Sequence, residues 1–189
     1  MGGLLLAAVA LGALHMAAPD HWAPLAASLA RRRYGRFALV AISALVGLTH
    51  GVLSVALALI AALAGAYVLP MAYIKYVSIA LLAAVSVGVL IGAVRGGGSG
   101  IDVEGSAAVS VLPDPAAIPL VLASLALGNS YAFLVAATFV VSSAASLAFV
   151  MSLADAGLSR ALRRVDPRYF DYVVAAVLAL TALYVYLAP

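Results

Sequence analysis

Apolar runs of membrane-spanning length, separated by short polar or flexible connectors, form the dominant pattern along this chain. A helix that crosses the hydrocarbon core of a bilayer needs about 20 mainly apolar residues, because each residue adds only about 1.5 Å. The fourth run carries three prolines, so it suits either a full span or a re-entrant segment. The pattern predicts six transmembrane helices, over Gly3–Leu29, Arg36–Ala64, Met71–Val94, Ala107–Leu127, Tyr131–Leu153 and Tyr169–Leu187.

Basic residues gather in the connectors on one side of this predicted bundle. Lysine and arginine are enriched in cytoplasmic loops, so we expect a multi-pass protein of the cell membrane with these connectors in the cytoplasm and both termini outside. No Lys or Arg precedes the first run, which continues past Pro19, and this favours a retained helix over a cleaved signal peptide. Only Lys75 falls at the opposite end; the nine others are Arg31, Arg32, Arg33, Arg36, Arg95, Arg160, Arg163, Arg164 and Arg168.

Two similar motifs lie half a chain apart. Pro-Asp-His-Trp-Ala-Pro-Leu at 19–25 corresponds to Pro-Asp-Pro-Ala-Ala-Ile-Pro-Leu at 113–120, at an offset of 94 residues. Three helices in each copy would make the second copy enter the membrane from the opposite side. We therefore expect one all-α transmembrane domain over residues 1–189, built as a 3+3 inverted repeat (about 1–94 and about 95–189) with proline-broken helices one and four. Transporters of this architecture hold substrate near the bilayer midplane, on broken helices.

Composition agrees with a membrane protein and removes several functional classes. Hydrophobic residues make up 67% of the chain and charged residues 9%, with a mean hydropathy of +1.20, whereas soluble domains carry about 25% charged residues. The absence of cysteine excludes disulfides, thiolate metal sites and dithiol redox chemistry. No basic patch is interleaved with aromatic residues, so we expect the lipid bilayer and no nucleic acid as a partner. The sequence leaves open whether the chain forms a homo-oligomer.

All three histidines lie in apolar runs of the N-terminal third, and two of them belong to the motif His15-Met-Ala-Ala-Pro19-Asp20-His21. An acid at mid-helix costs roughly 2.5–3.5 kcal/mol to insert into a membrane, so such groups are usually functional. Imidazole and carboxylate together suit a divalent transition metal. In a straight helix His15 and His21 would point about 120° apart. Pro19 clashes with the His15 carbonyl, so we expect a bend or unwinding that lets the side chains converge.

His50, in the second run, is the fourth candidate ligand. At about 1.5 Å per residue, its depth from the basic connector is about 21 Å, between about 15 Å for His21 and about 24 Å for His15. Gly47 and Gly51 flank it at helical spacing, which allows another helix to approach closely. We expect the three histidines and the aspartate of the first helix to hold one cation at mid-depth.

The spacing His15-x(4)-Asp20-His21 in one membrane helix, followed by His50 in the next, resembles the signature of the nickel/cobalt transporter family and its related urease-accessory membrane proteins. The resemblance implies a transporter rather than an enzyme, with Ni²⁺ or Co²⁺ as the transported substrate and no permanently bound cofactor. It also implies these four residues as metal ligands. The family includes importers and exporters, so the resemblance implies no direction.

Later motifs carry the resemblance less specifically. Pro-Asp-Pro at 113–115 and Leu-Gly-Asn-Ser at 127–130 are similar to segments of the smaller family members. The chain is shorter than many relatives and lacks a histidine-rich loop, and Asp114 stands where some relatives have cysteine. These departures make metal handling a broader expectation than transport of nickel or cobalt.

The sequence leaves alternatives for other residues and for the function. Asp114 corresponds to Asp20 and suits either a ligand or proton site on a transport path or a helix cap. Thr49 and Asn129 suit a transport path or helix packing. The His-x(4)-Asp pair also occurs in glycerolipid acyltransferases, where the acid orients a histidine base. A membrane-embedded lipid-modifying enzyme and a non-transporting scaffold or accessory protein are therefore the alternatives to a transporter.

Overall fold

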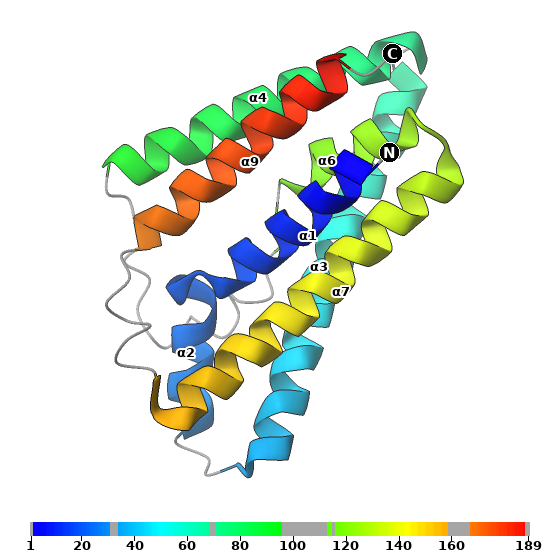
Figure 1. The fold of residues 1–189 in the computed structure, drawn as a ribbon. Helices are drawn as coiled ribbons and strands as arrows, with labels where there is room; N and C mark the ends of the chain where they lie inside the picture. The colour runs from blue at the N-terminus through cyan, green and yellow to red at the C-terminus, as the bar shows by residue number, and fades with distance from the viewer. Residues whose placement is uncertain are drawn as a thin grey trace.

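The described part of the chain is built of helices. The computed structural model describes residues 2–30, 34–68, 71–95, 113–114, 116–158 and 167–187. No strand occurs within these ranges, in agreement with the predicted all-α class. The elements in Figure 1 are α1 (Gly2–Ala17), α2 (Pro19–Ala30), α3 (Arg36–Val68), α4 (Met71–Arg95), α6 (Ala117–Leu125), α7 (Asn129–Leu153), the short π-helical turn η1 (Ala154–Leu158) and α9 (Pro167–Leu187).

Two helices are long and apolar enough to cross a membrane. They supply the stretches Arg36–Ala64 and Asn129–Gly157, each of 29 residues. Only 28% of the most apolar window in each stretch is buried, so these helices turn much of their apolar surface outward. A helix that is apolar all round belongs either inside a large core or in a membrane. Shorter apolar helices cover Gly2–Ala17, Ile79–Arg95 and Tyr172–Leu187.

The fourth predicted span is described only in its second part. Pro113 and Asp114 are not helical, and the nine residues of α6 extend about 14 Å, less than a membrane crossing requires. Residues 107–112 lie outside the described residues, as do several of the basic connectors. The count of six spans and the orientation therefore stay predictions.

The first predicted span is broken beside Pro19, as the sequence predicts. α1 ends at Ala17, Ala18 forms a bend, and α2 begins at Pro19, which suits the first position of a helix because proline has no N–H to leave unsatisfied. The Ala18 N–H donates to the His15 carbonyl at 3.2 Å, and the His21 N–H donates to the Ala18 carbonyl at 3.1 Å. Figure 1 shows α2 leaving the line of α1 at this point.

Glycines bring α3 and α7 together in antiparallel directions. A Cβ on Gly47 would lie 2.8 Å from the Ala144 Cα, and one on Gly51 would lie 2.9 Å from the Val140 Cα. Because such distances are too short for a real Cβ, the backbones approach this closely only at glycine. The close approach predicted around His50 is thus present, and α7 is the partner.

α2 and α6 lead to opposite ends of the molecule. α2 precedes the start of α3, and α6 precedes the start of α7 through a turn at Gly128, whose φ of 115° suits glycine. Since α3 and α7 are antiparallel, these two starts lie at opposite ends, as Figure 1 shows. α6 also packs against α3, and α2 packs against α7. α4 packs along α9.

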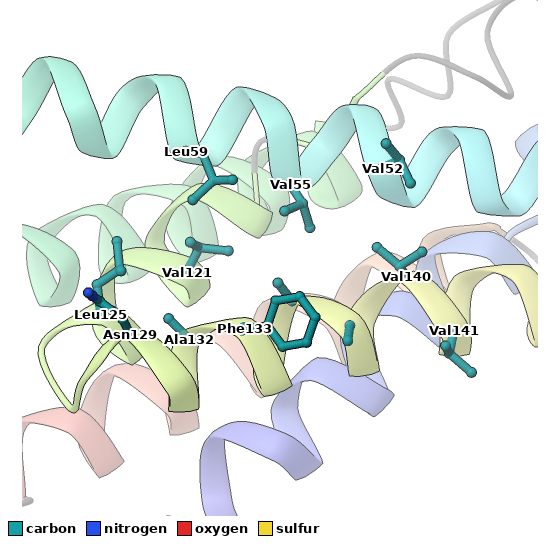
Figure 2. A pocket seen from close by; sticks show the side chains of 12 residues that line it. Val52, Val55, Leu59, Val121, Leu125, Asn129, Ala132, Phe133, Val140 and Val141 are labelled. Carbon is teal, nitrogen blue, oxygen red and sulfur yellow. The ribbon is translucent and has the colours of Figure 1, made fainter.

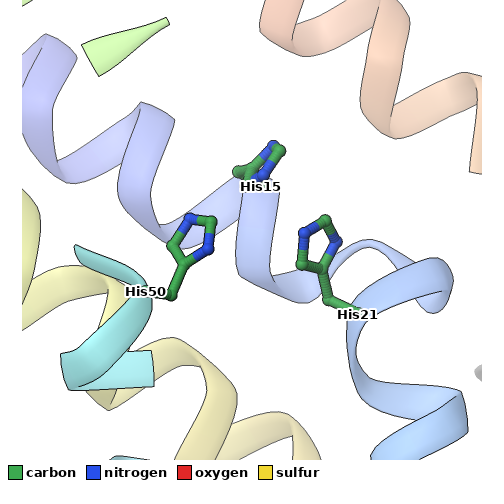
Figure 3. Close-up of side chains that lie close together, drawn as sticks. All are labelled: His15, His21 and His50. Carbon is green, nitrogen blue, oxygen red and sulfur yellow. The ribbon is translucent and has the colours of Figure 1, made fainter. Parts of the chain in front are cut away.

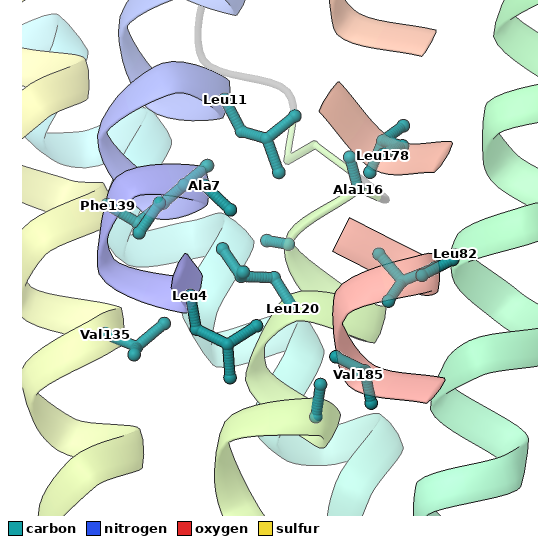
Figure 4. Packing of buried hydrophobic residues seen from close by; sticks show 14 of the residues in the cluster. Leu4, Ala7, Leu11, Leu82, Ala116, Leu120, Val135, Phe139, Leu178 and Val185 are labelled. Atoms are coloured by element: carbon teal, nitrogen blue, oxygen red, sulfur yellow. The ribbon is translucent and has the colours of Figure 1, made fainter. Parts of the chain in front are cut away.

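Two buried apolar clusters hold this arrangement. One packs α2 against α7, with Trp22 against Leu147 and Met151. The other joins α1, α4, α6, α7 and α9 (Figure 4). Its labelled members include Leu4, Leu11, Leu82, Leu120, Val135, Phe139 and Leu178.

We expect Gly51→Ala to destabilise the protein by about 1–3 kcal/mol, because its methyl group would meet the α7 backbone. Gly88→Ala on α4 is the matched control, since a Cβ there meets nothing within 4 Å. Relief of glycine's helix penalty makes this control neutral or stabilising by up to about 1 kcal/mol. Thermal unfolding in detergent measures both variants, and equal melting temperatures would contradict the packing described here.

Candidate metal centre

The three histidines of the chain converge in the structure. One candidate ligand nitrogen from each of His15, His21 and His50 lies within 4.8 Å of the other two. The ring centroids are 4.4 Å apart for His15 and His21, 5.3 Å for His15 and His50, and 5.7 Å for His21 and His50. Figure 3 shows the three rings turned toward a common space from three helices.

The bend at Ala18 brings the first two histidines together. His15 lies in the last turn of α1 and His21 in the first turn of α2, so the two side chains belong to different helix axes. On one straight helix they would diverge by about 120°. The bend therefore brings the His15 and His21 side chains together, as the sequence predicts.

His50 enters from the middle of α3. It lies fourteen residues from each end of the apolar stretch Arg36–Ala64, or about 21 Å along the helix. His50 is fully buried, and the Ser54 hydroxyl one turn later donates to its backbone carbonyl at 2.8 Å. The prediction that His50 shares a level with His15 and His21 is confirmed by these ring contacts.

Burial decreases across the cluster. The exposed fraction is 0% for His50 and 6% for His21, while the His15 side chain is 27% exposed. His15 is therefore the least buried of the three histidines.

The carboxylate beside the cluster comes from the second half of the chain. Asp114 Oδ2 lies 3.8 Å from His15 Nδ1, and Asp114 is 5% exposed. Asp114 Oδ1 accepts the Ala116 N–H at 2.8 Å and so closes the turn before α6, whereas the N-cap residue of α6 is Ala116, which makes no side-chain cap bond. The side chain of Asp20, the predicted acidic ligand, lies outside the described residues, although its backbone is part of α2.

Ser54 is a site residue that the sequence reasoning missed. Its oxygen accepts the Asp114 N–H at 2.8 Å while its hydroxyl donates to the His50 carbonyl, so it joins two residues of the site. The available signal was its spacing four residues after His50, on the same face of the helix.

The structure places Thr49 and Asn129 apart from the rings. The Thr49 hydroxyl donates to the Leu45 carbonyl of its own helix at 2.8 Å. Asn129 is exposed at the start of α7, eleven residues or about 16 Å before Val140, the residue that meets Gly51 beside His50. Their assignment to a transport path stays a prediction.

An apolar groove of about 550 Å³ lies elsewhere on the molecule, between α3, α6 and α7 (Figure 2). Valine, leucine and phenylalanine side chains form most of its wall, and Asn129 lies at its edge. None of the three histidines lines it. The groove is thus separate from the cluster of titratable groups.

The arrangement can bind a divalent transition metal after the rings move closer together. Nitrogens that share an ion at about 2.1 Å each lie about 3.0–3.4 Å apart. The present separations of up to 4.8 Å therefore need to shorten by more than about 1 Å, which requires rotation of the histidine side chains. Three imidazoles suit Zn²⁺, Ni²⁺ or Cu²⁺ and leave further positions for oxygen ligands.

Comparison with protein-family models, with curated proteins and with solved structures finds no match for this chain. The functional argument accordingly starts from the cluster itself.

The contact between the two halves of the chain can be tested by engineered cysteines, because the chain has no native cysteine. We expect a short bifunctional thiol reagent to join the H15C/D114C pair, since the His15 Nδ1 and Asp114 Oδ2 atoms approach to 3.8 Å and the cysteine side chains are one atom shorter. The T49C/D114C pair is the control, because the Thr49 hydroxyl bonds to its own helix. Gel mobility under non-reducing conditions reports the bond, and efficient cross-linking of the control alone would contradict the arrangement.

Proposed function

We propose that this protein is a membrane-embedded transporter of divalent transition-metal cations. The observation that carries the proposal is the convergence of His15, His21 and His50, whose ligand nitrogens lie within 4.8 Å of one another. The resemblance of the His-x(4)-Asp-His motif favours Ni²⁺ or Co²⁺ as the substrate.

A location in the membrane is supported by α3 and α7. Both contain apolar stretches of 29 residues with most of their surface outward, as expected for contact with lipid. His50 lies at the centre of the first stretch, so in a bilayer crossed by α3 the cluster is near the midplane. Six spans, with the arginine-rich connectors in the cytoplasm, complete the proposed topology.

The geometry of the two Pro-Asp motifs supports an inverted repeat. The first motif begins α2 and the second precedes α6, and both lie at the histidine cluster through His21 and Asp114. From there α2 and α6 lead to opposite ends of the antiparallel pair α3 and α7. A two-fold relation between the halves has this consequence, with α2 matching α6 and α3 matching α7.

In the proposed mechanism the imidazoles replace part of the hydration shell of the ion. Asp20, ionised, partly offsets the charge of the dication, as the motif predicts. Small rotations of one repeat against the other then open the site to each side in turn.

The alternatives are weighed by the same geometry. A lipid-modifying enzyme needs its histidine beside a groove that holds an acyl chain, whereas the apolar groove of Figure 2 is lined by none of the histidines. A scaffold without transport activity predicts a purified protein that binds no divalent metal.

Transport in proteoliposomes tests the proposal. Wild-type protein is expected to move Ni²⁺ or Co²⁺ across the bilayer, and His21→Ala should slow this by about 10–100-fold because one ligand is lost. Ser152→Ala is the matched control and should transport like the wild type, since that hydroxyl donates to the Ala148 carbonyl of its own helix. Undiminished transport by the folded His21→Ala variant, or no metal binding by the wild type, would refute the proposal.

A further inference from the structure

Asp114 is tied to the histidine cluster by a short chain of hydrogen bonds. The Ser54 hydroxyl donates to the His50 carbonyl, and the Ser54 oxygen accepts the Asp114 N–H, both at 2.8 Å. The non-helical segment that carries Asp114 is thereby fixed to the same turn of α3 as His50. Asp114 belongs to the second half of the chain and the other residues to the first.

The two carboxylate oxygens of Asp114 have different surroundings. Oδ1 accepts the N–H of Ala116, which begins the turn into α6. Oδ2 is directed to the other side, where it lies 3.8 Å from His15 Nδ1. The hydrogen bond to Ala116 therefore uses one carboxylate oxygen of Asp114, and the second oxygen lies at the edge of the cluster.

Charge provides an independent argument for Asp114. A dication held only by neutral imidazoles would carry its full charge into an apolar surrounding, which is strongly unfavourable without a counter-charge. Among the side chains that the structure describes, Asp114 is the one acidic group that is buried. A nearby carboxylate halves the net charge of the site.

We propose that Asp114 is an oxygen ligand of the transported ion and that Ser54 is the residue that positions it. This inference rests on the proposed metal transport and specifies the described ligands as three nitrogens and one carboxylate oxygen, in addition to Asp20, which the motif predicts. Two ligand atoms on one ion lie about 3.0–3.4 Å apart when the bonds are about 2.1 Å long. The 3.8 Å separation from His15 therefore needs to shorten by only a few tenths of an ångström.

The ligand set has a consequence for the transport cycle. Its three imidazoles come from the first half of the chain and its carboxylate from the second, so a bound ion joins the two halves directly. Metal binding then favours the conformation in which the halves are closed on the ion, because only there are all four ligands within reach. The nitrogen and oxygen donors also select for borderline divalent ions over the soft ion Cu⁺.

Binding of Co²⁺ to the purified full-length protein distinguishes a metal-ligand role of Asp114 from a purely structural role in the turn before α6. In Asp114→Asn the amide oxygen still accepts the Ala116 N–H, so the hydrogen bond of the turn is kept while the charge is lost. We expect the affinity for Co²⁺, measured by calorimetry, to fall by about 100-fold in this variant, and by about tenfold in Ser54→Ala, with Ser54→Thr close to the wild type. Ser54→Ala keeps the carboxylate itself and decides the question even if Asp114→Asn fails to fold.

A gain of signal tests direct ligation. In Asp114→Cys the new sulfur is the sole thiol of the chain, and a thiolate bound to Co²⁺ gives an intense near-ultraviolet charge-transfer band. We expect this band in Asp114→Cys and none in the control Thr49→Cys. Wild-type binding of Co²⁺ together with unchanged affinity in Asp114→Asn and Ser54→Ala, and no band in Asp114→Cys, would overturn this inference alone. Failure of the wild type to bind Co²⁺ would overturn the proposed function as well.

Discussion

Three imidazoles and a carboxylate lie inside an otherwise apolar bundle because each of them reaches another polar group there. A polar side chain buried among apolar ones is costly unless it is partnered, and a membrane offers no water to take that place. The ring contacts of His15, His21 and His50, and the approach of Asp114 to His15, meet this requirement collectively. The bend at Ala18 makes it geometrically achievable, since it turns the last residues of α1 and the first of α2 toward one space.

Helix α7 packs against both α1 and α3, the helices that carry His15 and His50. It meets α3 at Gly47 and Gly51, and it meets α1 through serines: the Ser146 hydroxyl donates to the Ala13 carbonyl at 2.7 Å, and Ser142 to the Ala8 carbonyl at 3.3 Å. Small residues and hydroxyl groups thus hold α1 and α3, which carry His15 and His50, against the same partner helix.

The proposed metal site is divided between the two halves of the chain. The first half supplies the nitrogen donors, and the second supplies Asp114 on a segment fixed by Ser54 to α3. A site divided between two parts of a chain is sensitive to their relative position, which is the property that an alternating-access transporter needs. The apolar groove between α3, α6 and α7 shares no histidine with this site and belongs to the outer surface of the bundle.

The sequence by itself determined the helical class, the break beside Pro19, and the level of His50 relative to His15 and His21. Each of these follows from local properties: the absence of polar positions over long runs, the missing N–H of proline, and the fixed rise of a helix. The tertiary structure alone decided that α7 covers the glycines around His50, that Ser54 holds the segment of Asp114, and that Asp114 reaches His15 from ninety-nine residues away. These facts depend on which face of each helix meets which neighbour. Hydropathy does not mark such faces when a helix is apolar around its whole circumference.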